Sequence, residues 1–363
     1  MTHNLMPLGG IQAWHGTQLA EDDRWRFRLT ADDIAAIDAA LMALKGREQP
    51  WQTLTTADFP LQGLAATLRR IGEELETGRG LVLISGLPVE RYDETDRRRL
   101  WWGMGQYLGL PVFQDFQGQL MRDITDARED TDGRFGHRLH ARDGTNFVSS
   151  KARTLSNGQL RYHTDRCDVV ALFCVHAAAA GGESRVASIS AIHDTIFERR
   201  PDLLTRLYEP YTRSRLGEEQ GGEHDTYDLP VFGVADGKLT SHYSRTYIEA
   251  AQEMPGVAPL NEQGWEALDL LAEVADELAF EMTMQPGDMQ FLNNHAIYHA
   301  RTAYRDPPEG PGRLMHRLWL SVPNSRRLPD DHRVLWGSVA AGVPRGGIGQ
   351  HVSGGTQGPD AVY

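Results

Sequence analysis

Two sets of residues with metal-binding side chains stand far apart in this chain, and a shared ion would require the fold to bring them together. The first set is His163 and Asp165, and the second is His299. Side chains two residues apart on a strand point to the same face, so His163 and Asp165 project together. His299 must then arrive from another strand. Two imidazoles and one carboxylate hold a non-haem iron(II) on one face and leave its other positions open for oxygen and a second substrate.

Two arginines follow His299 and share one face by the same rule. Arg313 and Arg317 point to one side if their segment is extended, and they stand roughly 13 Å apart at about 3.3 Å per residue. Two guanidinium groups on one inward face are costly without anions. The planar fork of arginine binds a carboxylate through two hydrogen bonds. The pair therefore predicts an anionic cosubstrate and an anionic or polar substrate.

Each of these signals has a plainer interpretation. A histidine and an aspartate two residues apart occur often by chance, and an arginine pair on a strand usually faces solvent. His295 and His299 are spaced like a zinc pair on a helix, which would suit a hydrolase. That stretch lacks the glutamate of the metalloprotease motif, and Asn293-Asn294 favours a turn. A non-catalytic jelly-roll protein that binds a metal or ligand is the alternative from another class.

The composition argues against several kinds of partner. The formal net charge of −13 disfavours nucleic acid, because phosphate binding needs a basic surface. No apolar run approaches the ~18 residues that span a membrane, and the N-terminal segment shows no signal peptide, so we expect a cytoplasmic protein. The only cysteines are Cys167 and Cys174. We expect them to be buried on opposite faces of one strand, in a reducing compartment.

The apolar periodicity predicts helices and strands within a single domain, residues 1–363. Helices are expected over residues 30–44, 61–77, 94–108, 192–207 and 264–280. Strands are expected over residues 81–86, 169–173, 185–189, 282–284, 289–292 and 314–322. We expect an N-terminal helical region (1–75), a core with helical insertions (76–325) and an irregular tail (326–363). The polar stretch 118–158 predicts a lid or, alternatively, a disordered insertion.

The chain resembles the taurine dioxygenase-like family of iron(II)/2-oxoglutarate-dependent oxygenases, over roughly residues 60–325. The segments that carry the resemblance are Tyr162–Asp165, Gly181–Ser184, Gly287-Asp288, Asn294–His299 and Arg313–Arg317. The two-part metal motif with its trailing arginine is the specific part of this match. This chain departs from many relatives just before the distal histidine, where it has Asn294-His295 instead of Asn-Arg.

The resemblance implies an α+β fold with a double-stranded β-helix (jelly-roll) core and flanking helices. It implies that His163, Asp165 and His299 hold Fe(II), and that Arg313 binds the distal carboxylate of 2-oxoglutarate. Ser184 corresponds to a hydroxyl that supports this contact, with Ser188 and Ser190 as alternatives. Arg317 corresponds to a substrate-facing arginine.

The same resemblance implies a reaction that consumes O2 and 2-oxoglutarate and releases succinate and CO2. We expect hydroxylation of an unactivated carbon in a small carboxylate-bearing molecule, such as an amino acid derivative. Desaturation, cyclisation and oxidative cleavage share the first steps and stay open, whereas the carboxylate of Asp165 argues against halogenation. Arg245 is a second candidate for an acidic group of the substrate, with a surface salt bridge as its alternative. A small molecule is the expected partner, and the sequence is compatible with a homo-oligomer.

Overall fold

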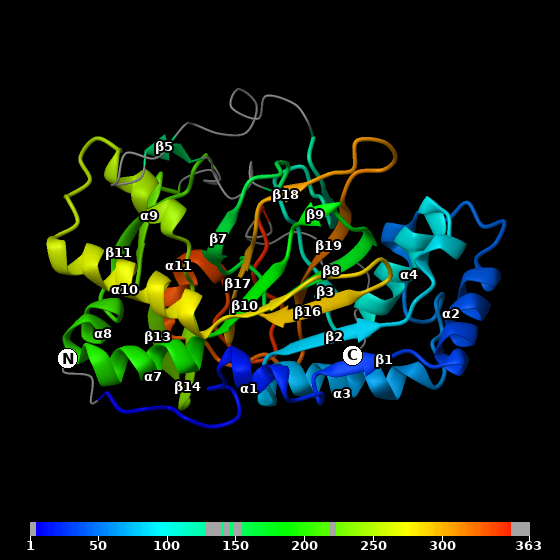
Figure 1. Ribbon diagram of the computed structural model, residues 1–363, viewed down its shortest axis with the longest axis horizontal. Coiled ribbons are helices and arrows are strands. Elements are labelled where there is room, and N and C mark those ends of the chain that lie inside the picture. Colours follow the sequence, from blue (N-terminus) through cyan, green and yellow to red (C-terminus); the bar gives the residue numbers. More distant parts are fainter. Residues whose placement is uncertain (1–4, 128–138, 141–145, 148–153, 218–222, 350–363) are drawn as a thin grey trace.

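The computed structural model describes residues 5–127, 139–140, 146–147, 154–217 and 223–349. Two β-sheets face each other, and helices cover the outer surface of each (Figure 1). The larger sheet has seven strands in the order β1-β2-β16-β8-β19-β3, with β4 also paired to β19. The smaller sheet has four strands in the order β15-β10-β17-β7. This is a mixed α+β architecture.

The bounds of the elements follow the chain. The helices are α1 (Gly16–Ala20), α2 (Ala31–Ala43), α3 (Leu64–Thr77), α4 (Glu94–Gln106), α7 (Ile189–Arg199), α8 (Pro201–Leu207), α9 (Arg245–Gln252), α10 (Glu262–Leu278) and α11 (Arg333–Trp336). The strands of the two sheets are β1 (Arg26–Arg28), β2 (Leu81–Ser85), β3 (Leu110–Pro111), β4 (Met121–Ile124), β7 (Leu160–His163), β8 (Val169–His176), β10 (Ser184–Ser188), β15 (Phe280–Met282), β16 (Met289–Asn293), β17 (Ile297–Arg301) and β19 (Leu314–Ser321). Two-stranded pairs are formed by β5 (Leu139–His140) with β6 (Asn146–Phe147), β9 (Ala180–Gly181) with β18 (Tyr304–Arg305), β11 (Tyr211–Ser214) with β12 (Thr226–Leu229), and β13 (Phe232–Ala235) with β14 (Lys238–Ser241).

The strands of the larger sheet alternate their side chains between two cores. In β19, Leu318 and Leu320 pack with helices α2, α3 and α4 on the outer face. Trp319, between them, points to the opposite face and packs with residues of the smaller sheet. Phe291 and Leu292 in β16 divide in the same way. A strand covered on both faces is buried along its whole length, and its side chains enter the two cores alternately.

The smaller sheet shows the same division. Val186 in β10 and Ile297 in β17 face the larger sheet, whereas Ala187 and Tyr298 pack against α7, α8 and α10. The space between the two sheets is therefore lined by every second residue of each strand. His299 is two residues after Ile297 in the same strand. Its side chain therefore points to the same face, into the space between the sheets.

Most of the expected elements are confirmed, with boundaries shifted by a few residues. The single helix expected over residues 192–207 is wrong, because two helices, α7 and α8, replace it. Pro201 cannot continue a helix from the preceding turn, and it starts α8 instead, while Arg200 leaves the helical region at φ −147°. The hairpins β11-β12 and β13-β14 were not expected from the sequence.

The expectation of an irregular tail is wrong for its first part. Residues 330–336 form a 3-10 turn and α11, and Leu328, Leu335 and Trp336 pack into a cluster with Tyr227 and Leu229. Residues 350–363 lie outside the described part of the chain.

The stretch 118–158 is not loop throughout, because β4 pairs with β19 along its length. The lid expected there falls mainly on residues 128–138, 141–145 and 148–153, which lie outside the described residues. Both cysteines are buried and free, as expected. They do not share a strand, since Cys167 precedes β8 and only Cys174 lies within it. Among the described helices, none combines the length and the apolar character that crossing a membrane requires.

Candidate active site

The three residues with metal-binding side chains converge between the two sheets. His163 ends β7 and lies directly opposite His299 in the neighbouring strand β17. Nε2 of His163 lies 3.7 Å from Oδ1 of Asp165, and Nε2 of His299 lies 3.8 Å from its Oδ2. One potential ligand atom from each of the three residues lies within 4.8 Å of the others, and all three side chains are buried. This spacing suits a single ion held by two nitrogens and one oxygen.

The protonation states that these surroundings favour are those of metal ligands. Burial lowers the pKa of His163, and it lowers the pKa of His299 to about 3, so both imidazoles are neutral. Burial alone would raise the pKa of Asp165, but the charge of Arg317 and the hydrogen bond from the Trp319 N–H outweigh it and hold this pKa below its usual range. The carboxylate is therefore ionised. Nδ1 of His163 lies 2.9 Å from the Arg161 carbonyl, which favours a proton there and leaves Nε2 for an ion.

A shell of hydrogen bonds fixes Asp165. The indole N–H of Trp319 donates to Oδ2 at 2.8 Å, and Nη1 of Arg317 donates to the same atom at 3.4 Å. The side-chain carbonyl of Asn294 accepts from the Asp165 backbone N–H at 3.0 Å, and its amide donates to the Cys167 carbonyl. Asn294 therefore ties the loop after β7 to the turn between β16 and β17.

His295 does not belong to the metal cluster, by which we mean the three candidate ligands of a single ion, His163, Asp165 and His299. Its ring lies between Thr240, 2.8 Å from Nδ1, and Asp168, 2.9 Å from Nε2. β16 ends at Asn293 and β17 begins at Ile297, so His295 and His299 are not on a helix. The zinc pair considered from the sequence is therefore wrong.

One cavity opens from the three candidate metal ligands on the side of His299. Arg313 lies in its wall and is only 5% exposed. Its guanidinium lies over the ring of Tyr304 at 5.2 Å, and its Nη1 is buried with no hydrogen-bond partner among the described residues. A buried donor that is left over in a cavity beside metal ligands suits the carboxylate of a small anion.

Ser184 lines this same cavity, and its hydroxyl donates to Oε1 of Gln290 at 3.0 Å. The two alternative serines do not line it. The hydroxyl of Ser188 donates to the Gln12 carbonyl and accepts from the Ala191 N–H at the start of α7, and Ser190 lies within that helix. Ser184 is thus the serine that the fold places with Arg313.

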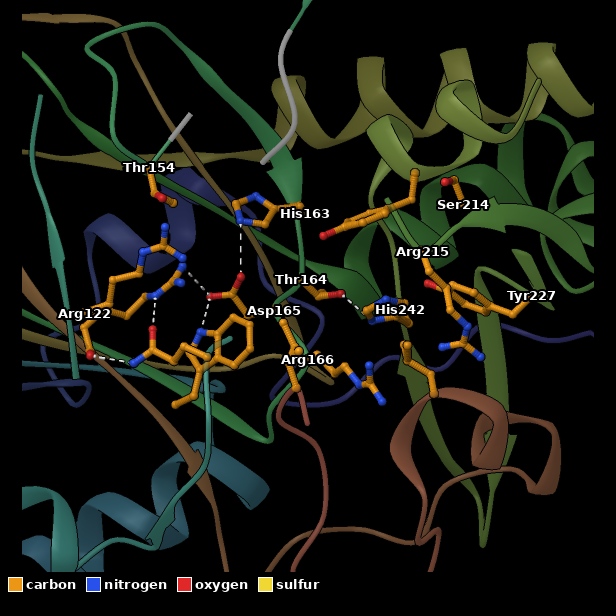
Figure 2. A pocket seen from close by; sticks show the side chains of 16 residues that line it. Arg122, Thr154, His163, Thr164, Asp165, Arg166, Ser214, Arg215, Tyr227 and His242 are labelled. Carbon is orange, nitrogen blue, oxygen red and sulfur yellow. Dashed lines mark hydrogen bonds and ion pairs between the residues drawn. The ribbon is translucent and has the colours of Figure 1, made fainter. Parts of the chain in front are cut away.

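A second cleft opens on the other side of Asp165 (Figure 2). His163, Asp165 and Arg317 border this cleft as well as the first cavity. The metal cluster therefore lies where two compartments meet, one with Arg313 and one lined by several further polar side chains. An enzyme that must bring a cosubstrate and a substrate to one ion needs this arrangement.

The two arginines considered for substrate binding have different positions. Arg317 borders both compartments, and its Nε donates to Gln114 at 2.8 Å. Arg245 begins α9 and pairs with Glu249 at 2.8 Å and Asp269 at 2.6 Å. It lines neither compartment, so its geometry agrees with the salt-bridge interpretation.

Several residues of the site were not identified from the sequence. Trp319 is two residues after Arg317. The rule that places Arg313 and Arg317 on one face of an extended segment would therefore have placed Trp319 there as well. Arg166 directly follows the first metal motif, where its charge is a visible signal. Arg215 and Gln114 give no local signal, because segments distant in sequence bring them to the cleft.

The family model "Taurine catabolism dioxygenase TauD, TfdA family" matches residues 47–319. FR-33289 synthase of Streptomyces rubellomurinus is 29% identical over 352 residues, covering 93% of this chain and 97% of the relative. The L-ornithine/L-arginine 3-hydroxylase of Catenulispora acidiphila is 23% identical over 351 residues, covering 86% and 99%.

A solved structure of asparagine oxygenase, in complex with Fe(II), 3-hydroxyasparagine and succinate, superimposes with a TM-score of 0.61. It is 16% identical to this chain and covers 88% of it and 100% of the oxygenase, so the likeness concerns the fold. The match over most of the chain and the convergence of His163, Asp165 and His299 lead to one assignment. The chain belongs to the TauD/TfdA family and is an iron(II)- and 2-oxoglutarate-dependent dioxygenase.

Proposed function

We propose that this dioxygenase hydroxylates an unactivated carbon of a small carboxylate-bearing molecule, such as an amino acid or its derivative. The observation that carries the proposal is the meeting of two compartments at one buried metal cluster. When bound, iron(II) supplies the chemistry that couples oxidative decarboxylation of 2-oxoglutarate to oxidation of the substrate. The protein residues bind and orient the two organic molecules on either side of it.

We assign the compartment that contains Arg313 to 2-oxoglutarate. The guanidinium would bind the carboxylate farther from the iron, and its unpaired Nη1 supports this role. Ser184 would give that carboxylate a second donor, in exchange for its bond to Gln290. Tyr304 covers one face of the guanidinium and holds it in place.

We assign the cleft on the other side of Asp165 to the substrate. Arg317 reaches this cleft while paired to Asp165, so it can contact an acidic group of the substrate close to the metal. Relatives named for asparagine, ornithine and arginine oxidation support the amino acid class. The two facing sheets are proposed to form the double-stranded β-helix of the asparagine oxygenase fold, within one domain.

A turnover experiment tests this function. The iron(II)-loaded enzyme is supplied with 2-oxoglutarate, ascorbate and a panel of amino acids and their derivatives, and succinate and product masses are measured. Hydroxylation predicts succinate and one added oxygen atom in equal amounts. A product that has lost two hydrogens would support desaturation or cyclisation instead, and fragments would support cleavage.

The matched control is His224→Ala, whose exposed imidazole lies outside both compartments and should leave turnover intact. Asp165→Ala should lose iron and turnover together. Hydroxylation that survives in Asp165→Ala would refute the assignment of the site.

A further inference from the structure

Gln290 places a buried amide in the wall of the compartment that we assign to 2-oxoglutarate. It lies in β16, where Met289 and Phe291 pack against the outer helical layer and Leu292 packs between the sheets. Gln290 points to the same face as Leu292, lines the compartment that contains Arg313 and is only 1% exposed. A buried amide is costly unless its donors and its acceptor are paired. The partners of Gln290 therefore indicate what this side chain does.

The side chain of Gln290 crosses from the larger sheet to the smaller one. In the larger sheet, Gln290 lies opposite Leu172 of β8, which lies opposite Arg317 of β19, and all three line the compartment. In the smaller sheet, Ser184 of β10 lies opposite Met282 of β15. Oε1 of Gln290 accepts from the Ser184 hydroxyl at 3.0 Å, and its Nε2 donates to the Met282 sulfur at 3.3 Å. The two ends of one amide thus contact neighbouring strands of the opposite sheet.

These two contacts differ in strength. The bond from the Ser184 hydroxyl is an ordinary hydrogen bond, whereas the thioether of Met282 is a weak acceptor. Rotation of the amide by half a turn would exchange Oε1 and Nε2 between the same two neighbours. It would give up the weak contact, and Nε2 would then donate to the Ser184 oxygen. A hydroxyl oxygen can accept one hydrogen bond while it donates another, so the Ser184 proton becomes available to a further acceptor.

The carboxylate of 2-oxoglutarate farther from the iron supplies that acceptor. Arg313 brings to the compartment a buried Nη1 that has no hydrogen-bond partner among the described residues, and Ser184 lines the same compartment. If Ser184 donated to the carboxylate while the amide stayed in place, its oxygen would face Oε1 of Gln290 at 3.0 Å with no proton between them. Rotation of the amide replaces this repulsion between lone pairs with a hydrogen bond.

We propose that Gln290 is a positioning residue for 2-oxoglutarate, and that its amide rotates so that the Ser184 hydroxyl donates to the distal carboxylate. The bonds then run from Nε2 of Gln290 to Oγ of Ser184, and from that hydroxyl to the carboxylate beside Arg313. We call this chain of bonds the relay. Hydrogen bonds in a chain polarise and strengthen one another. Gln290 acts through Ser184, and the inference rests on the proposed assignment of this compartment to 2-oxoglutarate.

A pair of 2-oxo acids measures recognition of the distal carboxylate. The iron(II)-loaded enzyme is titrated without oxygen, by calorimetry, with 2-oxoglutarate and with 2-oxopentanoate, which carries a methyl group in place of that carboxylate. Both molecules present the same 2-oxo acid group to the ion, so the ratio of their affinities reports the contacts of the distal carboxylate. We expect 2-oxoglutarate to bind the original protein at least roughly tenfold more tightly.

Variants of Gln290 should lower this ratio. Gln290→Met keeps a long buried side chain but removes the amide, and the ratio should fall roughly three- to tenfold, the contribution of one hydrogen bond. Gln290→Glu should lower it roughly tenfold or more, because its carboxylate accepts the Ser184 proton and repels the anion. The matched control is Gln252→Met. Gln252 accepts the Leu260 N–H at 2.7 Å and lines neither compartment, so this variant should keep the full ratio.

A double-mutant cycle tests whether Gln290 acts through Ser184. In a Ser184→Ala background, Gln290→Met should change the ratio by less than about twofold, because the hydroxyl that the amide directs is gone. A loss in that background as large as in the original protein would overturn the relay. An unchanged ratio in both Gln290→Met and Gln290→Glu would overturn it as well.

The ratio also separates the relay from a structural role and from the proposed function. A structural role predicts that Gln290→Met weakens both 2-oxo acids equally and lowers Tm with the ratio unchanged, which overturns the relay. If Arg313→Gln lowers the ratio and the Gln290 variants do not, the assignment of the compartment stands and the relay falls. A ratio near one in the original protein, unaltered in Arg313→Gln, would overturn the assignment and the relay together.

Discussion

Replacement of Trp319 by phenylalanine tests how the protein prepares its metal ligand. Trp319 lies in β19, is 5% exposed and donates from Nε1 to Oδ2 of Asp165 at 2.8 Å. Phenylalanine keeps an aromatic ring in the core between the sheets but removes the donor. Arg317 then remains as a longer contact to the same oxygen, at 3.4 Å. Asp165 would be less firmly oriented, and its negative charge less stabilised.

The size of the effect follows from this one bond. A hydrogen bond to a charged group in a buried site contributes about 1.5–3 kcal/mol, which corresponds to roughly 10- to 150-fold in an equilibrium constant. Outer-shell partners of metal ligands typically change metal affinity by about 10- to 100-fold. We therefore expect Trp319→Phe to weaken iron(II) binding by about 10- to 100-fold. The affinity for 2-oxoglutarate at saturating iron should change much less.

Anaerobic competition with a metal chelator measures the iron affinity directly. The control is Trp102→Phe, because the Trp102 indole also donates a buried hydrogen bond, to the Leu54 carbonyl at 2.9 Å, away from the site. This control should lose stability without losing iron affinity. An iron affinity of Trp319→Phe within about twofold of the original protein would refute the reasoning, as would an equal loss in Trp102→Phe.

Further predictions concern the cosubstrate, the ion and pH. Arg313→Gln should raise the KM for 2-oxoglutarate about 10- to 100-fold in steady-state assays, with iron affinity nearly unchanged; an unaltered KM would contradict its role. Removing iron with a chelator should lower Tm, because the ion binds only the folded arrangement, and re-addition should restore it. Burial lowers the pKa of His295 to about 4, against about 6.5 in an unfolded chain, so the unfolded state takes up the proton first on acidification. The free energy of unfolding of the metal-free protein should fall between pH 6.5 and pH 4, by about 3 kcal/mol from this group, and urea titrations at stepped pH should show a smaller fall in His295→Gln.

The residues of the metal cluster were predictable because strand geometry restricts them tightly. The period of two predicted that His163 lies with Asp165 and Arg313 with Arg317, and both pairs lie together although Asp165 directly follows the end of β7 and Arg313 directly precedes β19. These rules need only the knowledge that a segment is extended. The helices were predictable for a similar reason, since apolar residues at helical spacing define a face that must be buried. α3 shows this, with Leu64, Leu68, Ile71 and Leu75 all buried.

The cleft that we propose for the substrate was not predictable in the same way. Arg215 directly follows β11, and Leu335 and Ile348 come from the C-terminal part of the chain that the sequence suggested to be irregular. Their meeting depends on the packing of α11 against the β11-β12 hairpin, through Trp336 and Leu229. No periodicity within one segment contains that information, because it arises from contacts between segments distant in sequence.

The register of β19 links the stability of this fold to its chemistry. Arg313 directly precedes β19, and Arg317 and Trp319 lie within it; all three side chains face the compartments beside the metal ligands, where Arg317 and Trp319 contact the Asp165 carboxylate. Leu318 and Leu320 point to the opposite face and are completely buried against the helical layer. A slip of one residue would exchange the two faces, placing the arginines in the apolar core and the leucines beside the metal ligands. Because burying unpaired guanidinium groups is far costlier than exposing a leucine, the apolar core itself holds each functional side chain of this strand in its compartment.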